Sequence, residues 1–331
     1  MDKSTFASIV TPVTDMDSVL ERSIKECFNR LVNRYVPWIK RIPLEQGLTF
    51  EPTWKTLPTH SLTKRVWIER MKLKPEKVSR FRSSFTSFPH ELGAFQFLMN
   101  FVHAKGEQFS QGCLWPPRVR YAFDVNNKKF TPEDLDWFER RIGPLLPSCD
   151  DLGIPPVPGR LGCSLEGAGK RRIFAIGNYI NLWLLRPVHC WFASILKTIP
   201  MDGTYDQLRP LRRLVPSDNC FSYDLKSATD RWPLVYLFEI VALLFDRSFA
   251  SSVVNSTLAT NLFIVPFVRR YATVSFVAGQ PLGYYGSWPL FAFSHHLLVW
   301  WAAGQVRPGV RFDRYAVLGD DVLITDPLVA E

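Results

Sequence analysis

The chain has 331 residues, of which 47% are hydrophobic, 21% charged and 14% aromatic. This composition excludes an intrinsically disordered chain and a low-complexity fibre, and the length fits two or three subdomains better than a single core. The formal net charge is +9; residues 1–218 carry 32 basic and 22 acidic side chains, whereas residues 219–331 carry 8 and 9. By charge alone, the first two thirds suit a polyanionic partner and the last third does not.

The six cysteines are scattered, without a C-x-x-C pair or histidines at zinc-finger spacing, which indicates a reduced compartment and no structural zinc. The first residues contain no apolar run and carry three acidic residues up to Asp17, so we expect neither a signal peptide nor an Arg-rich transit peptide. Two apolar stretches, 233–245 and 284–303, approach the composition of a membrane span. The first is short and contains Glu239, and the second contains two histidines. We therefore expect two buried helices and no membrane span.

Residues 1–142 are expected to form a basic helical region. Apolar residues at helical spacing predict an amphipathic helix over 15–35. Nine Lys and Arg side chains lie among aromatic residues in 55–82, a pattern that suits nucleic acid but is at least as common on an ordinary solvated face. A strong helix start follows at Thr131. Five prolines in 143–159 then predict a linker.

The remaining chain predicts an α+β fold. Residues 176–199 have the composition of a buried helical region, interrupted at Pro187. From residue 220 onward, short β-rich runs alternate with longer apolar stretches. They predict a strand at 220–225, a helix at 233–245, strands at 263–268 and 272–277, a helix at 287–303, and strands at 314–318 and 322–325. We expect this β-α-β-β-α-β-β order to form one sheet covered by helices.

Three carboxylates lie where this sheet would bring them together. Asp224 ends the first strand, and Asp320 and Asp321 lie in a tight turn between two apolar strands. Adjacent carboxylates between buried strands repel one another unless a cation neutralises them. Oxygen ligands with room for phosphate favour Mg²⁺, or Mn²⁺ in its place, and two such ions stabilise the attacking and leaving oxygens of a phosphoryl transfer. Taken alone, Gly-Asp-Asp is also a common turn without chemistry.

Five segments follow one another in an order that is typical of a known family. They are GCSLEGAGKRRIFAIGNY (162–179), DGTYDQL (202–208), FSYDLKSATDRWP (221–233), GQPLGYYGSWPLFAFSHH (279–296) and YAVLGDDVLI (315–324). Together they resemble the successive motifs of mitovirus RNA-dependent RNA polymerases, of which derived copies also occur in plant genomes. The resemblance covers about residues 160–325. It implies a right-hand polymerase fold with fingers at 160–218 and a palm at 219–331.

The resemblance implies two-metal nucleotidyl transfer of ribonucleotides on an RNA template. Asp224 corresponds to the metal ligand of motif A, and Asp320 and Asp321 to the catalytic, metal-binding pair of motif C. The implied cofactor is Mg²⁺ or Mn²⁺, and the implied partners are nucleoside triphosphates and the RNA template and product. The family also implies a location in the mitochondrion.

The same resemblance implies contacts to the sugar of the incoming nucleotide. Asp230, six positions after the motif A aspartate, matches the residue that senses the ribose. Gly283 and Ser287 look like the Gly-x-x-x-Ser/Thr of motif B, whose hydroxyl can bind near the 2′-OH. Many viral RNA polymerases have an Asn four residues later, where this chain has Phe291. The sugar contact therefore rests on the Asp and Ser side chains, and the Ser is also a candidate helix N-cap.

Lys170, Arg171 and Arg172 resemble the basic motif of the fingers, which neutralises the triphosphate. Cations at that place offset charge on the pyrophosphate leaving group. His295 and His296 lie among Leu and Trp side chains, and we expect them to be buried and hydrogen-bonded rather than ligands of the site.

The family continues past the motif C pair through a motif D, usually with a lysine, and a thumb. Ten residues follow Asp321, and the last lysine of the sequence is Lys226. We therefore expect a fold without a thumb, incomplete for processive synthesis unless a second chain supplies one. Two alternatives stay open: a non-catalytic relic of an endogenised viral gene that folds poorly or only binds RNA, and, less strongly, a reverse transcriptase or intron maturase.

Overall fold

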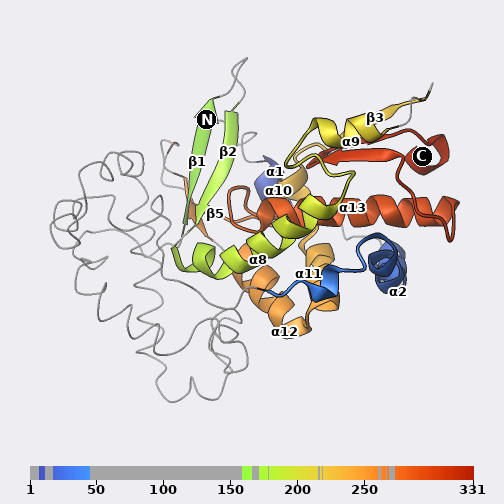
Figure 1. Ribbon diagram of the computed structural model, residues 1–331. Helices are drawn as coiled ribbons and strands as arrows, with labels where there is room; N and C mark the ends of the chain where they lie inside the picture. Colours follow the sequence, from blue (N-terminus) through green and yellow to red (C-terminus); the bar gives the residue numbers. More distant parts are fainter. Residues whose placement is uncertain are drawn as a thin grey trace, which may run out of the picture.

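The computed structural model describes residues 7–11, 18–44, 159–165, 171–177, 179–214, 217, 219–259, 262–265, 267 and 273–331. Helices and two β-sheets make up this part of the chain, so the predicted α+β class is confirmed (Figure 1). The predictions for the basic stretch 55–82, the helix start at Thr131 and the linker up to residue 158 lie outside the described residues.

A three-stranded antiparallel sheet carries the acidic turn. Its strands, in spatial order, are β3 (Phe221–Asp224), β7 (Asp321–Ile324) and β6 (Tyr315–Leu318). The register places Asp224 opposite Asp321. Beyond the edge of β6, Val317 forms a parallel bridge with Asp202. The strands predicted on both sides of the Gly-Asp-Asp turn are therefore confirmed within a residue or two.

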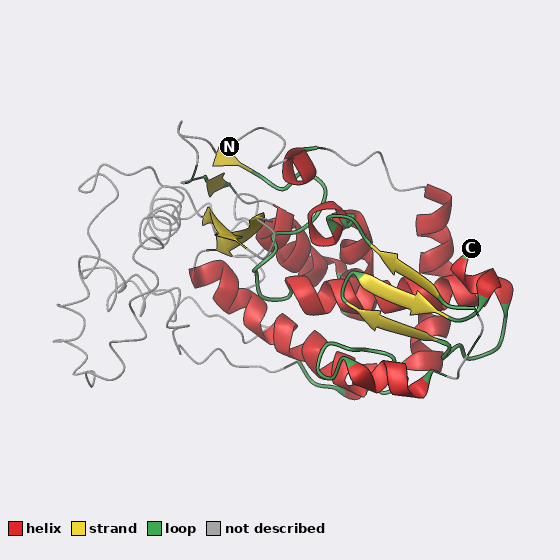
Figure 2. Ribbon diagram, turned by 90° about the horizontal axis from the view of Figure 1, so that it is seen from above, coloured by secondary structure: helices red, strands yellow, loops and turns green. Residues whose placement is uncertain are grey.

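A second, four-stranded sheet lies apart from the first (Figures 1 and 2). Its strands, in spatial order, are β2 (Arg171–Gly177), β1 (Gly159–Leu165), β4 (Phe263–Ile264) and β5 (Thr273–Val274). The prediction of one sheet is wrong, because β4 pairs in parallel with β1 instead of joining the acidic strands. Gly159 permits this pairing, since a Cβ there would lie 2.7 Å from the ring of Phe263.

Helix α13 (Ser287–Val306) lies at the centre and is buried along most of its length. It packs against α8 (Tyr179–Thr198), α2 (Ser18–Tyr35) and β6. The predicted interruption of the helical region 176–199 at Pro187 is wrong, because α8 runs through this residue. The proline removes one backbone donor from the helix, and burial of Pro187 and its neighbours stabilises α8 despite that loss.

The other helices are shorter. They are α1 (Ala7–Val10), the 3₁₀ helix η2 (Ile39–Arg41), α9 (Leu208–Arg213), α10 (Ala228–Arg231), α11 (Leu234–Leu244), α12 (Arg247–Ala250), the π-helix η8 (Ser251–Ala259) and α14 (Pro327–Ala330). The predicted buried helix at 233–245 corresponds to α11, which starts directly after Pro233. Of the helices in the described ranges, none combines the length and apolar character that crossing a bilayer requires.

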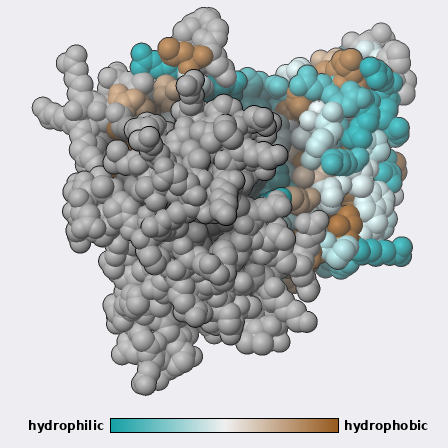
Figure 3. All heavy atoms as spheres, turned by 60° about the vertical axis from the view of Figure 1, so that its left-hand side comes forward, coloured by the Kyte–Doolittle hydropathy of each residue, from teal (hydrophilic) through white to brown (hydrophobic). Residues whose placement is uncertain are grey.

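The hydrophobic core joins α2, α8, α11 and α13 beneath the acidic sheet. Tyr35 and Trp300 stack with ring centroids 4.4 Å apart, and Phe192 packs against Phe293 at 5.5 Å. On the face drawn in Figure 3, the described residues present mainly hydrophilic surface with small hydrophobic groups between. The core therefore supports the acidic sheet from below and leaves the carboxylate side to solvent.

Candidate functional site

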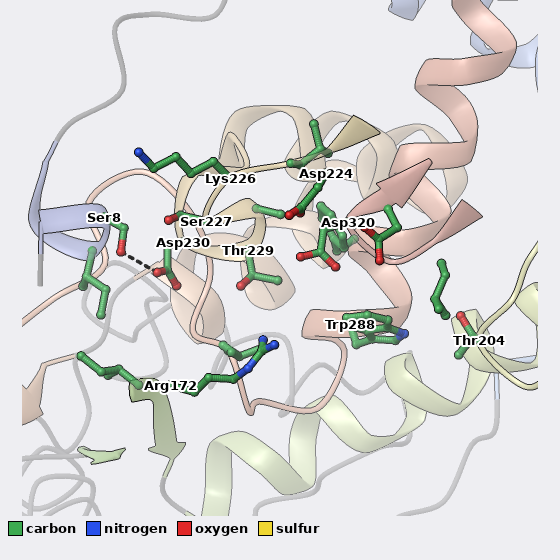
Figure 4. Close-up of a pocket in the computed structure, with 18 of the residues that line it drawn as sticks. Ser8, Arg172, Thr204, Asp224, Lys226, Ser227, Thr229, Asp230, Trp288 and Asp320 are labelled. Carbon is green, nitrogen blue, oxygen red and sulfur yellow. Dashed lines mark hydrogen bonds between the residues drawn. The ribbon is translucent and has the colours of Figure 1, made fainter. Parts of the chain in front are cut away.

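A cavity of about 1030 Å³ is lined by residues of both sheets and of α1, α10 and α13 (Figure 4). Six of the nine residues predicted for the site line it: Asp224, Asp230, Asp320, Asp321, Arg171 and Arg172. Gly283 and Ser287 are absent from the lining, and Lys170 lies outside the described residues. The fold therefore brings together side chains that are up to 150 positions apart in the sequence.

The acidic residues are positioned by the ends of two paired strands. Asp224 is the last residue of β3 and Asp321 the first of β7, and they face each other in the register. The backbone N–H of Leu225 donates a hydrogen bond to the carbonyl oxygen of Asp320 at 3.2 Å. Figure 4 shows the side chains of Asp224 and Asp320 in the same part of the cavity. Strand pairing thus sets the spacing of the acidic groups.

The charged form of Asp321 is disfavoured at this position. Loss of solvent raises the pKa of Asp321, and the charges of Asp320 and Asp224 raise it further. Within the described ranges, no group of three or more His, Cys, Asp or Glu side chains already has the spacing of a metal site. The carboxylates fit a divalent cation by their oxygen donors and charge, and they would have to move closer together to enclose it.

Helix α13 holds the acidic turn from below. Gly319, with φ of 61°, directly precedes the two aspartates, and a Cβ on it would overlap the ring of Trp288. Nδ1 of His295 lies 2.7 Å from the carbonyl oxygen of Gly319, and because that oxygen can only accept, Nδ1–H donates. Burial lowers the pKa of His295 to about 4, so the ring is neutral at pH 7. The prediction that His295 is buried and hydrogen-bonded is confirmed.

His296 is the centre of a second buried network. Its Nε2 donates to Oδ2 of Asp202 at 3.0 Å, and its Nδ1 lies 2.9 Å from the hydroxyl of Tyr315 on β6. Asp202 also accepts from the backbone N–H of Thr204 at 2.9 Å. His296 and Asp202 have no exposed surface. This network attaches the loop after α8, where Thr204 lines the cavity, to the strand that leads into the acidic turn.

Sequence reasoning missed the structural role of Asp202. The residue lies in the segment DGTYDQL, but nothing in that segment distinguishes a buried aspartate from an exposed one such as Asp206. The parallel bridge to Val317 and the bond to His296 depend on residues about 100 positions away. The available signal for this contact would have been an isolated Asp-Gly dipeptide together with a histidine in a predicted helix. That signal is weak.

Basic side chains form the opposite wall of the cavity. Arg171 and Arg172 begin β2 and are exposed, opposite Leu165 and Ser164 of β1 in the register. Figure 4 shows Arg172 across the cavity from Asp224. Because both residues are exposed, an anion can bind to them at a low desolvation cost. The cavity therefore has an acidic and a basic side.

The two motif B residues have packing roles in this structure. Gly283 has φ of 108°, and a Cβ on it would lie 2.6 Å from the carbonyl oxygen of Ala175 on β2. Ser287 starts α13 with 1% exposure, and its Oγ has no hydrogen-bond partner within the described part of the chain. Their neighbours Leu282 and Trp288 line the cavity instead. The segment thus joins β2 to α13 at the cavity floor.

An acidic turn that faces arginines across one cavity is typical of enzymes that transfer phosphoryl groups. The model of the family described as mitovirus RNA-dependent RNA polymerase matches residues 62–331. The chain therefore belongs to this family, as the five ordered segments predicted. It is 33% identical over 180 residues to the RNA-directed RNA polymerase of Cryphonectria parasitica mitovirus 1, a match that covers 53% of this chain and 22% of the viral protein.

Two mitochondrial proteins of Arabidopsis thaliana, both described as uncharacterized, are also similar. The first is 66% identical over 143 residues, which is 42% of this chain and 70% of that protein. The second is 49% identical over 146 residues, which is 42% of this chain and 57% of that protein. The chain thus matches most of one relative, little more than half of the other and about a fifth of the viral polymerase.

Proposed function

We propose that this chain carries the catalytic site of an RNA-dependent RNA polymerase and transfers ribonucleotides on an RNA template. The observation that supports it best is one cavity lined by Asp224, Asp320 and Asp321 on one side and by Arg171 and Arg172 on the other. A nucleoside triphosphate needs this combination, because its phosphates require both a divalent cation and fixed positive charges. Membership of the polymerase family supports the same assignment.

We propose that Asp224, Asp320 and Asp321 hold Mg²⁺ or Mn²⁺. The mutual repulsion that raises the pKa of Asp321 supports this role, since a bound cation would remove it. When bound, such ions neutralise the charge that develops on the phosphoryl oxygens during transfer. The hydrogen bond from Leu225 to the Asp320 carbonyl and the pairing of β3 with β7 keep the three side chains at one edge of the sheet.

We propose that Arg171 and Arg172, together with Lys170, bind the triphosphate. Their position on the opposite side of the cavity supports it for the two arginines. Guanidinium groups bind phosphate oxygens through two parallel hydrogen bonds, which orients the leaving pyrophosphate as well as neutralising it.

We propose that Asp230 contacts the ribose, because its carboxylate lies in the same cavity and can accept from a sugar hydroxyl. A direct sugar contact by Ser287 would need its buried Oγ to become accessible; the missing partner of that oxygen supports a role that appears only with substrate. Gly283 would act by allowing the close approach of β2 to the loop before α13.

We propose that the β3-β7-β6 sheet, with α11 and α13, forms the palm of the polymerase, and that residues 160–218 form the fingers. β4 pairs with β1 and β5 pairs with β4, so we place both with the fingers although they lie beyond residue 218. The similarity to the two mitochondrial proteins of Arabidopsis supports a mitochondrial location.

The proposal is tested by incorporation of labelled ribonucleotides by the full chain on a primed RNA template with Mg²⁺ or Mn²⁺. Asp320→Asn should reduce incorporation on the order of a thousandfold, a change of about 4 kcal/mol in the barrier. Asp313→Asn, at an exposed carboxylate before β6, is the matched control and should incorporate normally. Incorporation that persists in Asp320→Asn, or none in the unmodified chain, would exclude the proposed function.

RNA binding without catalysis is the second candidate. The observation in its favour is that the described acidic residues do not already form a compact metal group. A chain that binds RNA with strong salt dependence but incorporates nothing would support this candidate. Preference for deoxynucleotides in the same assay would instead indicate a reverse transcriptase.

A further inference from the structure

A residue near the start of the chain reaches the cavity. Oγ of Ser8, in α1, donates a hydrogen bond of 2.8 Å to Oδ2 of Asp230, across 222 positions of sequence. Figure 4 shows this bond at one side of the cavity, away from Asp224 and Asp320. Ser8 precedes the segment 62–331 that matches the polymerase family, so the family resemblance assigns it no role.

Helix α1 is anchored in the core beside the cavity. Ile9, next to Ser8, is 1% exposed and belongs to the hydrophobic core. The carbonyl oxygen of Ile9 accepts a hydrogen bond of 3.2 Å from the backbone N–H of Val277. The neighbouring residue is therefore anchored through both its side chain and its backbone, and the hydroxyl of Ser8 reaches the cavity from a fixed point.

The backbone around Asp230 is also fixed. Gly279 lies so close to α10 that a Cβ would overlap the carbonyl oxygen of Thr229. The N–H of Gln280 donates to that same carbonyl at 2.8 Å. With its backbone held, Asp230 can change only its side-chain rotamer, and the bond to Ser8 selects one rotamer.

We propose that Ser8 is a positioning residue that selects for ribonucleotides: it holds one carboxylate oxygen of Asp230 so that the other accepts from a sugar hydroxyl. This inference rests on the proposed function. An ionised carboxylate has about four acceptor positions, so a bond to Ser8 leaves room for a second hydroxyl. A site built around such an acceptor rejects the deoxy analogue, which leaves the half-buried acceptor unpaired.

The competing arrangement has the Ser8 hydroxyl in the place of the sugar hydroxyl. The two arrangements predict opposite changes in ATP affinity when the Ser8 hydroxyl is removed. If Ser8 positions Asp230, its removal weakens ATP binding and leaves 2′-deoxy-ATP nearly unchanged. If Ser8 competes with the sugar, its removal tightens ATP binding.

The test measures equilibrium dissociation constants of ATP and 2′-deoxy-ATP for the full chain with Mg²⁺, which needs no catalytic turnover. Ser8→Ala should lower the preference for ATP about fivefold, as expected for one hydrogen bond. Ser8→Thr keeps the hydroxyl and should keep the preference. Ser194→Ala is the matched control, since it removes a hydroxyl that donates to Trp191 of its own helix, and it should change neither constant.

The ratio of the two constants is insensitive to a uniform loss of folded protein. An unchanged ratio in Ser8→Ala, tighter ATP binding in that variant, or equal affinities in the unmodified chain would overturn the role of Ser8. The proposed polymerase function fails separately, if ribonucleotide incorporation is absent while the preference for ATP and its loss in Ser8→Ala are both observed.

Discussion

The acidic and basic sides of the cavity are built in different ways. On the acidic side, the turn rests on Trp288 and on the buried His295, and the strand before it is attached to the buried Asp202 through His296. On the basic side, Arg171 and Arg172 extend from a β-hairpin into solvent. The first side is held by buried hydrogen bonds and packing, whereas the second side is exposed.

This difference fits the proposed roles of the two sides, which are metal binding and triphosphate binding. Carboxylates that repel one another need a scaffold that keeps them together in the absence of a cation, and buried hydrogen bonds supply it. Arginines that bind a triphosphate need only reach it, and their hydration is favourable until then. Substitutions behind the acidic turn should therefore lower stability, whereas substitutions on the basic wall should lower binding and leave stability nearly unchanged.

Asp202→Ala should have the largest effect on stability. It leaves Nε2–H of His296 and the N–H of Thr204 without their acceptor inside the core. Removing one partner of a buried pair costs about 4 kcal/mol in the free energy of unfolding. Urea unfolding followed by circular dichroism measures it, with Asp313→Ala, at an exposed aspartate before β6, as the control that should stay within about 0.5 kcal/mol. Equal effects in the two variants would contradict the support of the acidic side by buried hydrogen bonds.

Gly319→Ala should have the second largest effect on stability. Its φ of 61° disfavours any side chain, and the added Cβ would overlap Trp288. Backbone strain of about 1 kcal/mol and overpacking of about 2 kcal/mol together lower the free energy of unfolding by about 3 kcal/mol. Gly309→Ala is the control: its φ is 85°, but nothing lies within 4 Å of a Cβ there. The difference between the two variants isolates the contact with Trp288, and no difference would mean that the turn is free to move.

Local patterns predicted the elements around the acidic turn well. The strands on either side of Asp320 and the helix that starts at Ser287 were located from apolar runs and turn residues alone. Such features depend on neighbours within a few positions, which is the range over which periodicity carries information. The family resemblance then supplied the grouping of the acidic and basic residues, most of which the cavity brings together.

Pairings across long sequence separations were not predictable. The parallel pairing of β1 with β4 joins segments about 100 residues apart, and it divided the one predicted sheet into two. The bond between Ser8 and Asp230 spans 222 positions, and neither residue differs from an ordinary helical serine or aspartate in its local pattern. Pro187 was expected to break a helix because local propensity disfavours it, but burial of α8 outweighed that propensity.

The pH dependence of stability tests the role of Asp326, which lies at the end of the acidic sheet remote from the cavity. Burial raises the pKa of Asp326, but hydrogen bonds and charges from Arg307 and Arg314 outweigh this, so the pKa lies below its ordinary value. Its stabilising contribution is complete above about pH 4 and is lost as the pH falls through the lowered pKa. Asp326→Asn keeps the cap on Leu328 and should cost about 2 kcal/mol at pH 7 and little at low pH.

The measurement is the unfolding free energy at pH 7 and in acid, with Asp313→Asn as the exposed control. A loss in Asp326→Asn that is the same at both pH values would show that the charge of Asp326 is not what stabilises the region.

Arg171→Gln should have the smallest effect on stability and thus separates the two sides most clearly. The side chain is exposed at the start of β2, so the free energy of unfolding should change by less than about 0.5 kcal/mol. Loss of one charge-assisted contact to a phosphate should nevertheless weaken ATP binding about tenfold in the presence of Mg²⁺. Adenosine, which lacks the phosphates, is the control ligand and should bind both proteins alike. If Arg171→Gln instead destabilised the fold as Asp202→Ala does, the basic wall would be a structural element like the acidic turn, and the contrast between the two sides would be wrong.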